Sequence, residues 1–245
     1  MSMLRAGWRL GRGMLHALAG LATVLLLFPR WDEARRHARV QSWSREMLAV
    51  LGIQLELHGQ PPQQGPMLLA ANHISWLDIL VMHASRHCRF VAKAEVRHWP
   101  MIGTMATGAG TLYIERESRR DAMRVVHRIA ASLVRGEIVG VFPEGTTSDG
   151  VSLLPFHGNL IQAAISAGAP VQPVALEFVD SATRAPSFAP RYIDDDSLLG
   201  SAWRTLSAPP LTAVVRYGQP QTPQGRDRRA WAAALRSSVE ELRRG

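Results

Sequence analysis

The chain has 245 residues, of which 47% are hydrophobic and 20% are charged, so it can bury a sizeable core and is not a disordered chain. Its formal net charge is +8, and its basic residues are all arginines except Lys93. Cys88 is the single cysteine, which excludes an intramolecular disulfide and a multi-cysteine metal site. A basic excess suits anionic lipid headgroups or nucleic acid. The sequence shows no aromatic-rich basic platform for reading bases, so a membrane surface is favoured over nucleic acid.

The N-terminal part carries one long apolar run, residues 14–28. As a helix this run would span about 22 Å against a hydrocarbon core of about 30 Å, so it is short for a spanning helix. Arginines flank it on both sides, which gives no inside–outside asymmetry. A second, amphipathic helix is expected over residues 34–51. We therefore predict a membrane-associated helical hairpin over residues 1–50, broken at Pro29, which re-enters the bilayer or lies at its cytoplasmic interface. A cleaved signal peptide is the alternative, but the segment after the apolar run lacks a small-residue cleavage site.

Beyond residue 52, short apolar runs alternate with helical stretches. This alternation predicts an α/β fold over residues 51–245, with a mostly parallel sheet flanked by helices. Residues 180–210, rich in Pro, Ser, Asp and Ala, are expected to form a surface excursion or a lid. The expected strands are Met67–Ala71, Arg89–Ala92, Thr111–Ile114, Ile138–Phe142, Val171–Phe178 and Thr212–Tyr217, and the expected helices cover 76–86, 119–135, 158–167 and 229–243.

The segment Asn72–Asp78 follows an expected strand and opens an expected helix. Ser75 and Asp78 have the spacing of a capping box. With His73 in the loop before the cap, the chain can fold back so that the carboxylate of Asp78 reaches the imidazole. A carboxylate on one ring nitrogen fixes the tautomer and leaves the other nitrogen free to take a proton. His73 is therefore a candidate general base, although an isolated pattern of this kind is also typical of a helix cap beside a loop histidine.

Three further segments follow in order, and together with Asn72–Asp78 the chain resembles the glycerolipid acyltransferase family, typified by 1-acyl-sn-glycerol-3-phosphate acyltransferases. These segments are Gly110–Arg116, Phe142–Thr146 and Val171–Val174. The resemblance covers roughly residues 50–178. It implies an enzyme of phospholipid biosynthesis at the cytoplasmic face of the inner membrane. This O-acyltransferase would move a fatty acyl group from acyl-CoA or acyl carrier protein to the free hydroxyl of lysophosphatidate, giving phosphatidate.

The same resemblance implies roles for individual residues. His73 would act as the base and Asp78 would orient it. Arg116 would bind the headgroup phosphate through its guanidinium, and Lys93 would face the developing thioester oxyanion or the phosphate. The complete set of implied substrate-binding residues is Arg116, Glu144, Gly145, Lys93 and Thr146. Because a thioester is already activated, no metal and no cofactor besides the donor is expected, and the oligomeric state stays open.

One departure from the family pattern bears on the acceptor. Thr147 stands where family members often carry a basic residue, and the run that follows is similar to lyso-ornithine lipid acyltransferases, so that acceptor is the main alternative. A lipid hydrolase and a non-catalytic lipid-binding protein are more remote alternatives. His83 and His87 have the spacing of a helical metal pair, but we expect them on a solvated helix face, and we expect Cys88 to be a small core residue.

Overall fold

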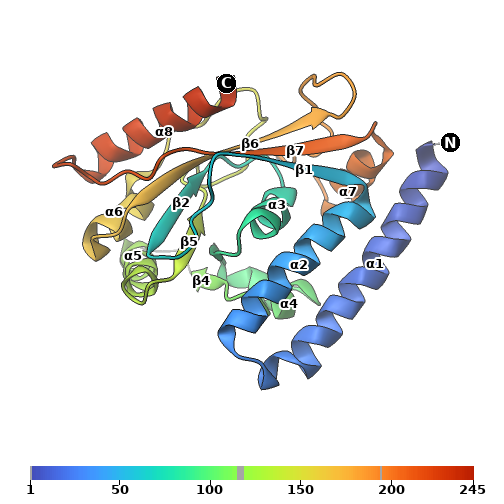
Figure 1. Cartoon of the computed structure of the whole chain (residues 1–245), viewed down its shortest axis with the longest axis horizontal. Coiled ribbons are helices and arrows are strands. Elements are labelled where there is room, and N and C mark those ends of the chain that lie inside the picture. Colours follow the sequence, from blue (N-terminus) through green and yellow to red (C-terminus); the bar gives the residue numbers. More distant parts are fainter. Residues whose placement is uncertain (1, 115–118, 194) are drawn as a thin grey trace.

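The computed structural model describes residues 2–114, 119–193 and 195–245. Its centre is a seven-stranded sheet in the order β1-β7-β6-β2-β5-β3-β4 (Figure 1). Every neighbouring pair is parallel except β6 and β7, which confirms the predicted mostly parallel α/β fold. The strands are β1 (Ile53–His58), β2 (Met67–Ala71), β3 (Arg89–Lys93), β4 (Leu112–Ile114), β5 (Ile138–Val141), β6 (Val171–Asp180) and β7 (Leu211–Tyr217).

The sequence prediction missed β1, which pairs in parallel with β7 at one edge of the sheet. Ile53 is buried at its start, whereas the residues after it are half-buried or exposed. An edge strand of this kind covers little apolar surface, so it lacks the continuous apolar run by which the buried strands were predicted.

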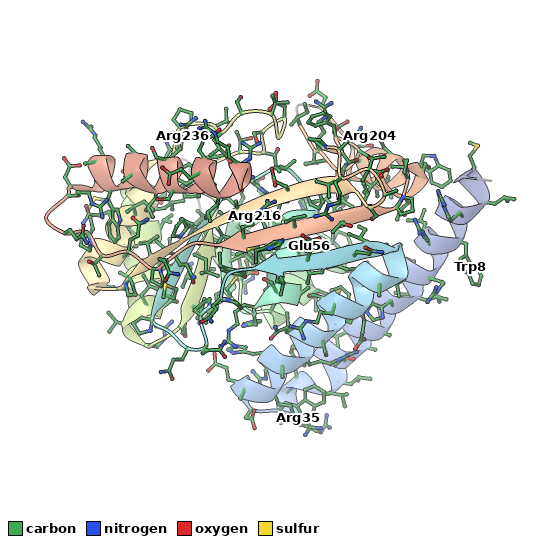
Figure 2. All side chains as sticks on the ribbon, turned by 45° about the horizontal axis from the view of Figure 1, so that its top comes forward. Trp8, Arg35, Glu56, Arg204, Arg216 and Arg236 are labelled. Carbon is green, nitrogen blue, oxygen red and sulfur yellow. The ribbon has the colours of Figure 1, made fainter. Side chains whose placement is uncertain are left out.

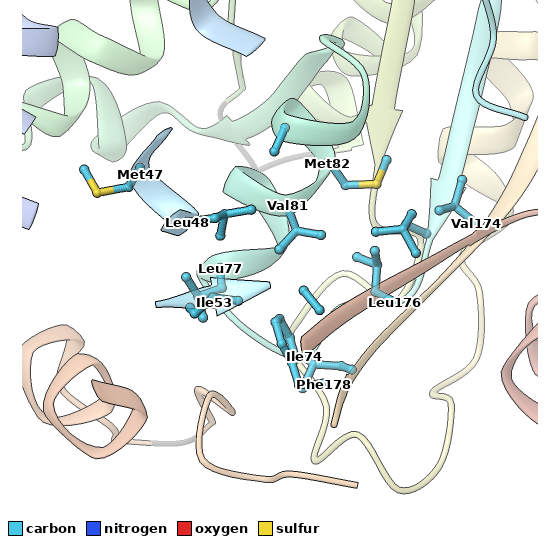
Figure 3. Packing of buried hydrophobic residues seen from close by; sticks show 14 of the residues in the cluster. Met47, Leu48, Ile53, Ile74, Leu77, Val81, Met82, Val174, Leu176 and Phe178 are labelled. Atoms are coloured by element: carbon cyan, nitrogen blue, oxygen red, sulfur yellow. The ribbon is translucent and has the colours of Figure 1, made fainter. Parts of the chain in front are cut away.

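Helices cover both faces of the sheet (Figure 1). Side chains alternate along β2, so Leu69 faces the layer of α2 and α3, while Leu68 faces the layer of α5, α6 and α8. Figure 3 shows the first of these cores, in which Leu48 and Leu77 pack towards Leu176 on β6. The helices are α1 (Ser2–Leu26), α2 (Glu33–Leu51), α3 (Leu77–Ser85), α4 (Ile102–Gly108), α5 (Arg119–Val134), α6 (Gly158–Ala167), α7 (Leu198–Ser207) and α8 (Arg228–Arg244), with 3-10 turns η1 (Phe28–Arg30) and η2 (Ala94–His98).

Helices α1 and α2 lie side by side and are joined through η1, which contains Pro29 (Figure 1). Ala6, Gly13 and Gly20, spaced by seven residues, are buried on one side of α1. A Cβ atom on Gly20 would lie 2.5 Å from Nε1 of Trp43, so this glycine allows α1 and α2 to approach closely. The predicted helical arrangement of the N-terminal part is therefore present.

The first helix is longer than the apolar run of residues 14–28. α1 has 25 residues, because the preceding arginine-bearing turns belong to the same helix. At 1.5 Å per residue its length is about 37 Å. Among the described residues, Met3–Arg30 is long and apolar enough to cross a membrane by length and composition. Only 11% of its most apolar stretch of 18 residues is buried inside the protein. Trp8, 68% exposed, projects away from the body of the protein (Figure 2).

Candidate active site

The loop between β2 and α3 brings His73 and Asp78 together, as predicted. Nδ1 of His73 lies 2.7 Å from Oδ2 of Asp78. The carboxylate is fully buried, whereas the imidazole keeps 19% of its side-chain surface exposed. With Nδ1 donating its proton to Asp78, Nε2 remains available as a proton acceptor. The ring of His73 also stacks on Phe142, with 3.9 Å between the ring centroids.

Asp78 shapes the loop as well as orienting the imidazole. Its Oδ2 accepts backbone N–H groups from Ile74 at 2.7 Å and from Ser75 at 2.9 Å. The predicted capping box is half formed: the Asp78 carboxylate accepts the N–H of Ser75, but the Ser75 hydroxyl accepts the N–H of Leu77 at 3.2 Å and not that of Asp78. The same hydroxyl donates to Pro190 O. The Asp78 carboxylate therefore fixes His73 and the two backbone amides that follow it.

Glu144, in the loop after β5, is buried and bonded to backbone. Oε1 accepts the N–H of His73 at 2.7 Å, and Oε2 accepts the N–H of Leu154 at 3.0 Å. Burial raises the pKa of this carboxyl above its usual value, and the two backbone hydrogen bonds act in the opposite direction. Glu144 therefore connects the loop after β5 with the His73 loop, a contact that spacing in the sequence could not reveal. Its predicted contact with substrate stays a prediction.

The segment after Glu144 also reaches the backbone of His73. Gly145 has a φ of +77°, a left-handed conformation that favours glycine, and it lies in an exposed turn with Thr146. Further on, Ser148 donates its backbone N–H to His73 O at 2.7 Å and its hydroxyl to the same oxygen at 3.1 Å. The sequence prediction gave Ser148 no role, and its position two residues after the Phe142–Thr146 segment was the available signal.

The segment before α7 crosses over both loops, which fits the prediction that residues 180–210 contain a lid or surface excursion. Pro190 O accepts the Ser75 hydroxyl at 2.5 Å, and the N–H of Tyr192 donates to Ile74 O at 3.1 Å. The hydroxyl of Thr147 donates to Tyr192 O. We call residues 186–193 the strap. Thr147 thus holds the strap at the position where family members often carry a cation.

Asn72 anchors the start of the His73 loop to the neighbouring strand. Its side-chain amide donates to Leu176 O at 3.0 Å, and its Oδ1 accepts the N–H of Leu176 at 2.7 Å. Asn72 is 1% exposed, so both bonds lie within the core. The sequence analysis quoted Asn72 as part of the motif but assigned it no function. The contact spans 104 positions of sequence, which no local pattern encodes.

The other predicted substrate-binding residues lie apart from this cluster or outside the described residues. Lys93 ends β3 and is exposed, with no hydrogen bond or ion pair to any described residue. Arg116 falls in 115–118, which lie outside the described residues. The structure therefore brings His73, Asp78, Glu144 and the loop of Gly145 and Thr146 together, and it leaves Lys93 two strands away from β2.

The prediction that His83 and His87 lie on a solvated helix face was wrong. Both are buried, and His37 from α2 stacks on His87 with 3.9 Å between ring centroids. Burial lowers the pKa of His83 to about 4 and depresses that of His87 as well. No group of three or more potential metal-ligating side chains occurs among the described residues. Cys88 is buried, as predicted, and burial raises the pKa of its thiol.

Comparison with known proteins agrees with the motifs. The family model described as Acyltransferase matches residues 53–177. A 1-acyl-sn-glycerol-3-phosphate acyltransferase of Neisseria meningitidis is 42% identical over 190 residues, covering 76% of this chain and 72% of the relative. A lyso-ornithine lipid O-acyltransferase of Pseudomonas aeruginosa is 39% identical over 197 residues, covering 80% and 75%.

The fold has a counterpart among solved structures. The crystal structure of the 1-acyl-sn-glycerophosphate acyltransferase PlsC from Thermotoga maritima superposes with a TM-score of 0.70 at 16% identity, covering 99% of this chain and 96% of that one. The matched region of the family model contains all of the described residues that hold His73. Fold, motif order and sequence similarity therefore agree, and the chain belongs to the Acyltransferase family.

Proposed function

We propose that this acyltransferase moves a fatty acyl group from a thioester donor to the free hydroxyl of a lyso-lipid. The observation that carries the proposal is the imidazole of His73, oriented by the buried carboxylate of Asp78 at 2.7 Å and still partly open to solvent. Lysophosphatidate is the first candidate acceptor, since a relative at 42% identity bears the name 1-acyl-sn-glycerol-3-phosphate acyltransferase.

The reaction needs one base and no covalent enzyme intermediate. Nε2 of His73 takes the proton of the acceptor hydroxyl as its oxygen attacks the thioester carbonyl. The tetrahedral intermediate collapses, the carbon–sulfur bond breaks, and the protonated imidazole returns its proton to the departing thiolate. Asp78 stabilises the imidazolium that forms between these steps, because its carboxylate accepts from Nδ1. The thioester donor in this proposal is acyl-CoA or acyl carrier protein carrying a fatty acyl group.

Lyso-ornithine lipid is a second candidate acceptor, and Thr147 favours it. A threonine bonded to the strap supplies no positive charge for a phosphate. The acceptors can be separated by comparing both lyso-lipids with wild-type protein and Thr147→Arg. If the absent guanidinium matters, the arginine variant raises the preference for lysophosphatidate. An unchanged ratio of kcat/KM values for the two lipids contradicts that reasoning.

The N-terminal hairpin fits a protein whose acceptor and product are lipids. Met3, Leu4 and Leu15 on α1 are all more than two-thirds exposed, and Arg5 and Arg12 are exposed on the same helix. Apolar side chains beside arginines suit the boundary between acyl chains and anionic headgroups. We propose that α1 holds the protein at the cytoplasmic face of the inner membrane. A chain lacking residues 1–30 is expected to lose membrane retention; an unchanged membrane fraction contradicts this role.

The test of the proposed function is acyl transfer by purified protein in detergent. Labelled acyl-CoA and acyl carrier protein are supplied with a panel of lyso-lipids, and products are identified by mass. Because general-base assistance contributes about 10²–10⁴-fold, His73→Ala is expected to reduce turnover by at least about 10²-fold while thermal unfolding shows a folded protein. Near-normal transfer by folded His73→Ala refutes the mechanism. Release of free fatty acid without acylated acceptor identifies a hydrolase, and lipid binding without turnover identifies a binding protein.

A further inference from the structure

The C-terminal helix α8 is connected to the loop between β5 and α6 through Arg236. Trp231 and Leu235 are fully buried on one face of α8 and hold the helix against the core. Arg236, labelled in Figure 2, lies on another face and is half-buried. Its Nη2 donates to Leu153 O at 2.6 Å, and its Nε donates to Leu154 O at 3.1 Å. The planar guanidinium therefore binds two successive carbonyl groups of the loop.

The peptide group between Leu153 and Leu154 is hydrogen-bonded on both sides. Its carbonyl oxygen accepts from Arg236, and its N–H donates to Oε2 of Glu144 at 3.0 Å. A trans peptide points its C=O and N–H groups in opposite directions, so this peptide lies between the guanidinium and the carboxylate. The positive group on one side and the negative group on the other polarise the peptide in the same sense. Each of the two hydrogen bonds is therefore strengthened by the other.

The second carboxylate oxygen of Glu144 extends this connection to the base. Oε1 accepts the backbone N–H of His73 at 2.7 Å, and the Glu144 side chain is buried. Burial raises the pKa of this carboxyl, whereas the hydrogen bonds from His73 and Leu154 favour its ionised form. A continuous series of hydrogen bonds thus runs from Arg236 through one peptide group and one carboxylate to the backbone of His73.

The loop is also held by apolar packing that does not depend on Arg236. Leu153 and Phe156 are buried in the same cluster as Trp231 and Leu235. Loss of the guanidinium would therefore leave α8 and the loop in place, and would release only the peptide group that bonds to Glu144. This separates the orientation of one peptide from the folding of the domain.

We propose that Arg236 is a positioning residue for acyl transfer. It fixes the peptide between Leu153 and Leu154, so that Glu144 keeps the backbone of His73 where Nε2 can accept the proton of the acceptor hydroxyl. The proposal rests on the proposed function, because it takes His73 as the base. Arg236 acts through other groups and binds neither substrate, so its loss slows the reaction and leaves substrate binding intact.

The first experiment is steady-state kinetics of Arg236→Met. Methionine keeps an unbranched apolar stem but removes every N–H donor of the guanidinium. Because a displacement of about 1 Å can cost about 10²-fold in rate, we expect kcat to fall about tenfold while the KM values for donor and acceptor stay within about twofold. An unchanged kcat, or a raised KM with kcat unchanged, overturns the proposal.

The matched control is Arg243→Met, on the same helix. Arg243 donates to Gly150 O at 2.5 Å and to Val151 O at 3.2 Å in the same loop. The N–H groups of these two peptides donate to Asp149, so this contact does not lead to the base. Both variants are expected to lower the Tm, whereas Arg243→Met keeps kcat within about twofold of wild type. An equal loss of kcat in both variants overturns the proposal, because it makes the effect a general loosening of the loop.

A double-mutant cycle tests whether Arg236 acts through Glu144. Groups in one hydrogen-bond network have non-additive effects, whereas independent groups have additive ones. The kcat of Arg236→Met/Glu144→Gln is therefore expected to lie within about twofold of that of Glu144→Gln alone. A double variant whose loss of kcat is the product of the two single losses contradicts the connection.

Amide hydrogen exchange tests the connection without turnover. In Arg236→Met, the amides of Leu154 and His73 are expected to exchange about tenfold or more faster than in wild-type protein, whereas Arg243→Met leaves the exchange of His73 unchanged. An unaltered rate at His73 in Arg236→Met overturns the proposal even where acyl transfer is observed. If wild-type protein transfers no acyl group but the His73 amide responds to Arg236→Met, the proposed function fails and the connection from α8 to the His73 loop stands.

Discussion

Glu144 offers a direct test of how the site is held together. Its two carboxylate oxygens accept the N–H groups of His73 at 2.7 Å and Leu154 at 3.0 Å, and its side chain is 3% exposed. Glutamine keeps the shape but has a single acceptor oxygen. Whichever way the amide turns in Glu144→Gln, its NH₂ group faces one of the two backbone N–H donors.

The expected cost follows from these contacts. A hydrogen bond to a charged group contributes about 1.5–3 kcal/mol, and a buried donor left without an acceptor costs about 1–3 kcal/mol. Part of this cost is offset, because a neutral amide does not carry the cost of burying a charged carboxylate. The same burial raises the pKa of the Glu144 carboxyl. We therefore expect Glu144→Gln to lower the free energy of unfolding by about 2 kcal/mol, which corresponds to about 4–8 °C in Tm for a chain of this size.

Thermal unfolding and steady-state kinetics check this expectation together. A displaced His73 loop lowers kcat by about 10–100-fold with little change in the KM for the acceptor. Glu241→Gln, an exposed glutamate on α8, is the matched control and is expected to change neither quantity. An unchanged Tm accompanied by a raised acceptor KM refutes this reasoning, since it makes Glu144 a substrate contact and not a connection between loops.

Three further predictions concern the hairpin, the buried histidines and the strap. Gly20→Ala places a Cβ 2.5 Å from Trp43 and is expected to separate α1 from α2, seen as faster proteolysis of the hairpin, whereas Gly11→Ala, with nothing within 4 Å, is the control. His83 has a pKa lowered to about 4, so it stays neutral in the folded protein. Its contribution to stability is therefore present above about pH 6.5 and is lost as the pH falls toward 4. Urea unfolding of His83→Gln is expected to show a shallower pH dependence than wild-type protein, and an identical profile contradicts this. Thr147→Val removes the hydroxyl bond to the strap and is expected to destabilise the protein by about 1 kcal/mol, as measured by urea unfolding; equal stability shows that this bond contributes nothing.

The sequence predicted those features whose causes are local. β2 is a continuous apolar run buried at all five positions, and such runs are typical of the central strands of parallel sheets. His73 and Asp78 lie five positions apart, on either side of a helix start, so their contact depends on a single turn of chain. The order of the four motifs identified the family, because unrelated chains do not carry four such segments in the same order.

Features that depend on distant segments could not be predicted from spacing. The contact of Glu144 with His73 spans 71 positions and that of Asn72 with Leu176 spans 104. His83 and His87 lie at helical spacing that is equally consistent with a solvated face, and only the return of α2, which brings His37 onto His87, buries them. Such outcomes are set by how elements pack together, which a pattern within one element does not contain.

The direction of the strands explains why so many of these groups gather at one edge. β2, β5, β3 and β4 are all parallel, so the loops that follow them emerge on the same side of the sheet. His73 and Glu144 lie in those loops, and Lys93 is the last residue of β3 at the same edge. Lys93 is exposed at this edge, and the resemblance implies that it faces the developing thioester oxyanion or a phosphate. Lys93→Ala is therefore expected to lower kcat/KM for acyl transfer while the Tm stays unchanged, because the exposed ammonium group bonds to no described residue. Full activity in this variant contradicts a place for Lys93 at the reacting groups.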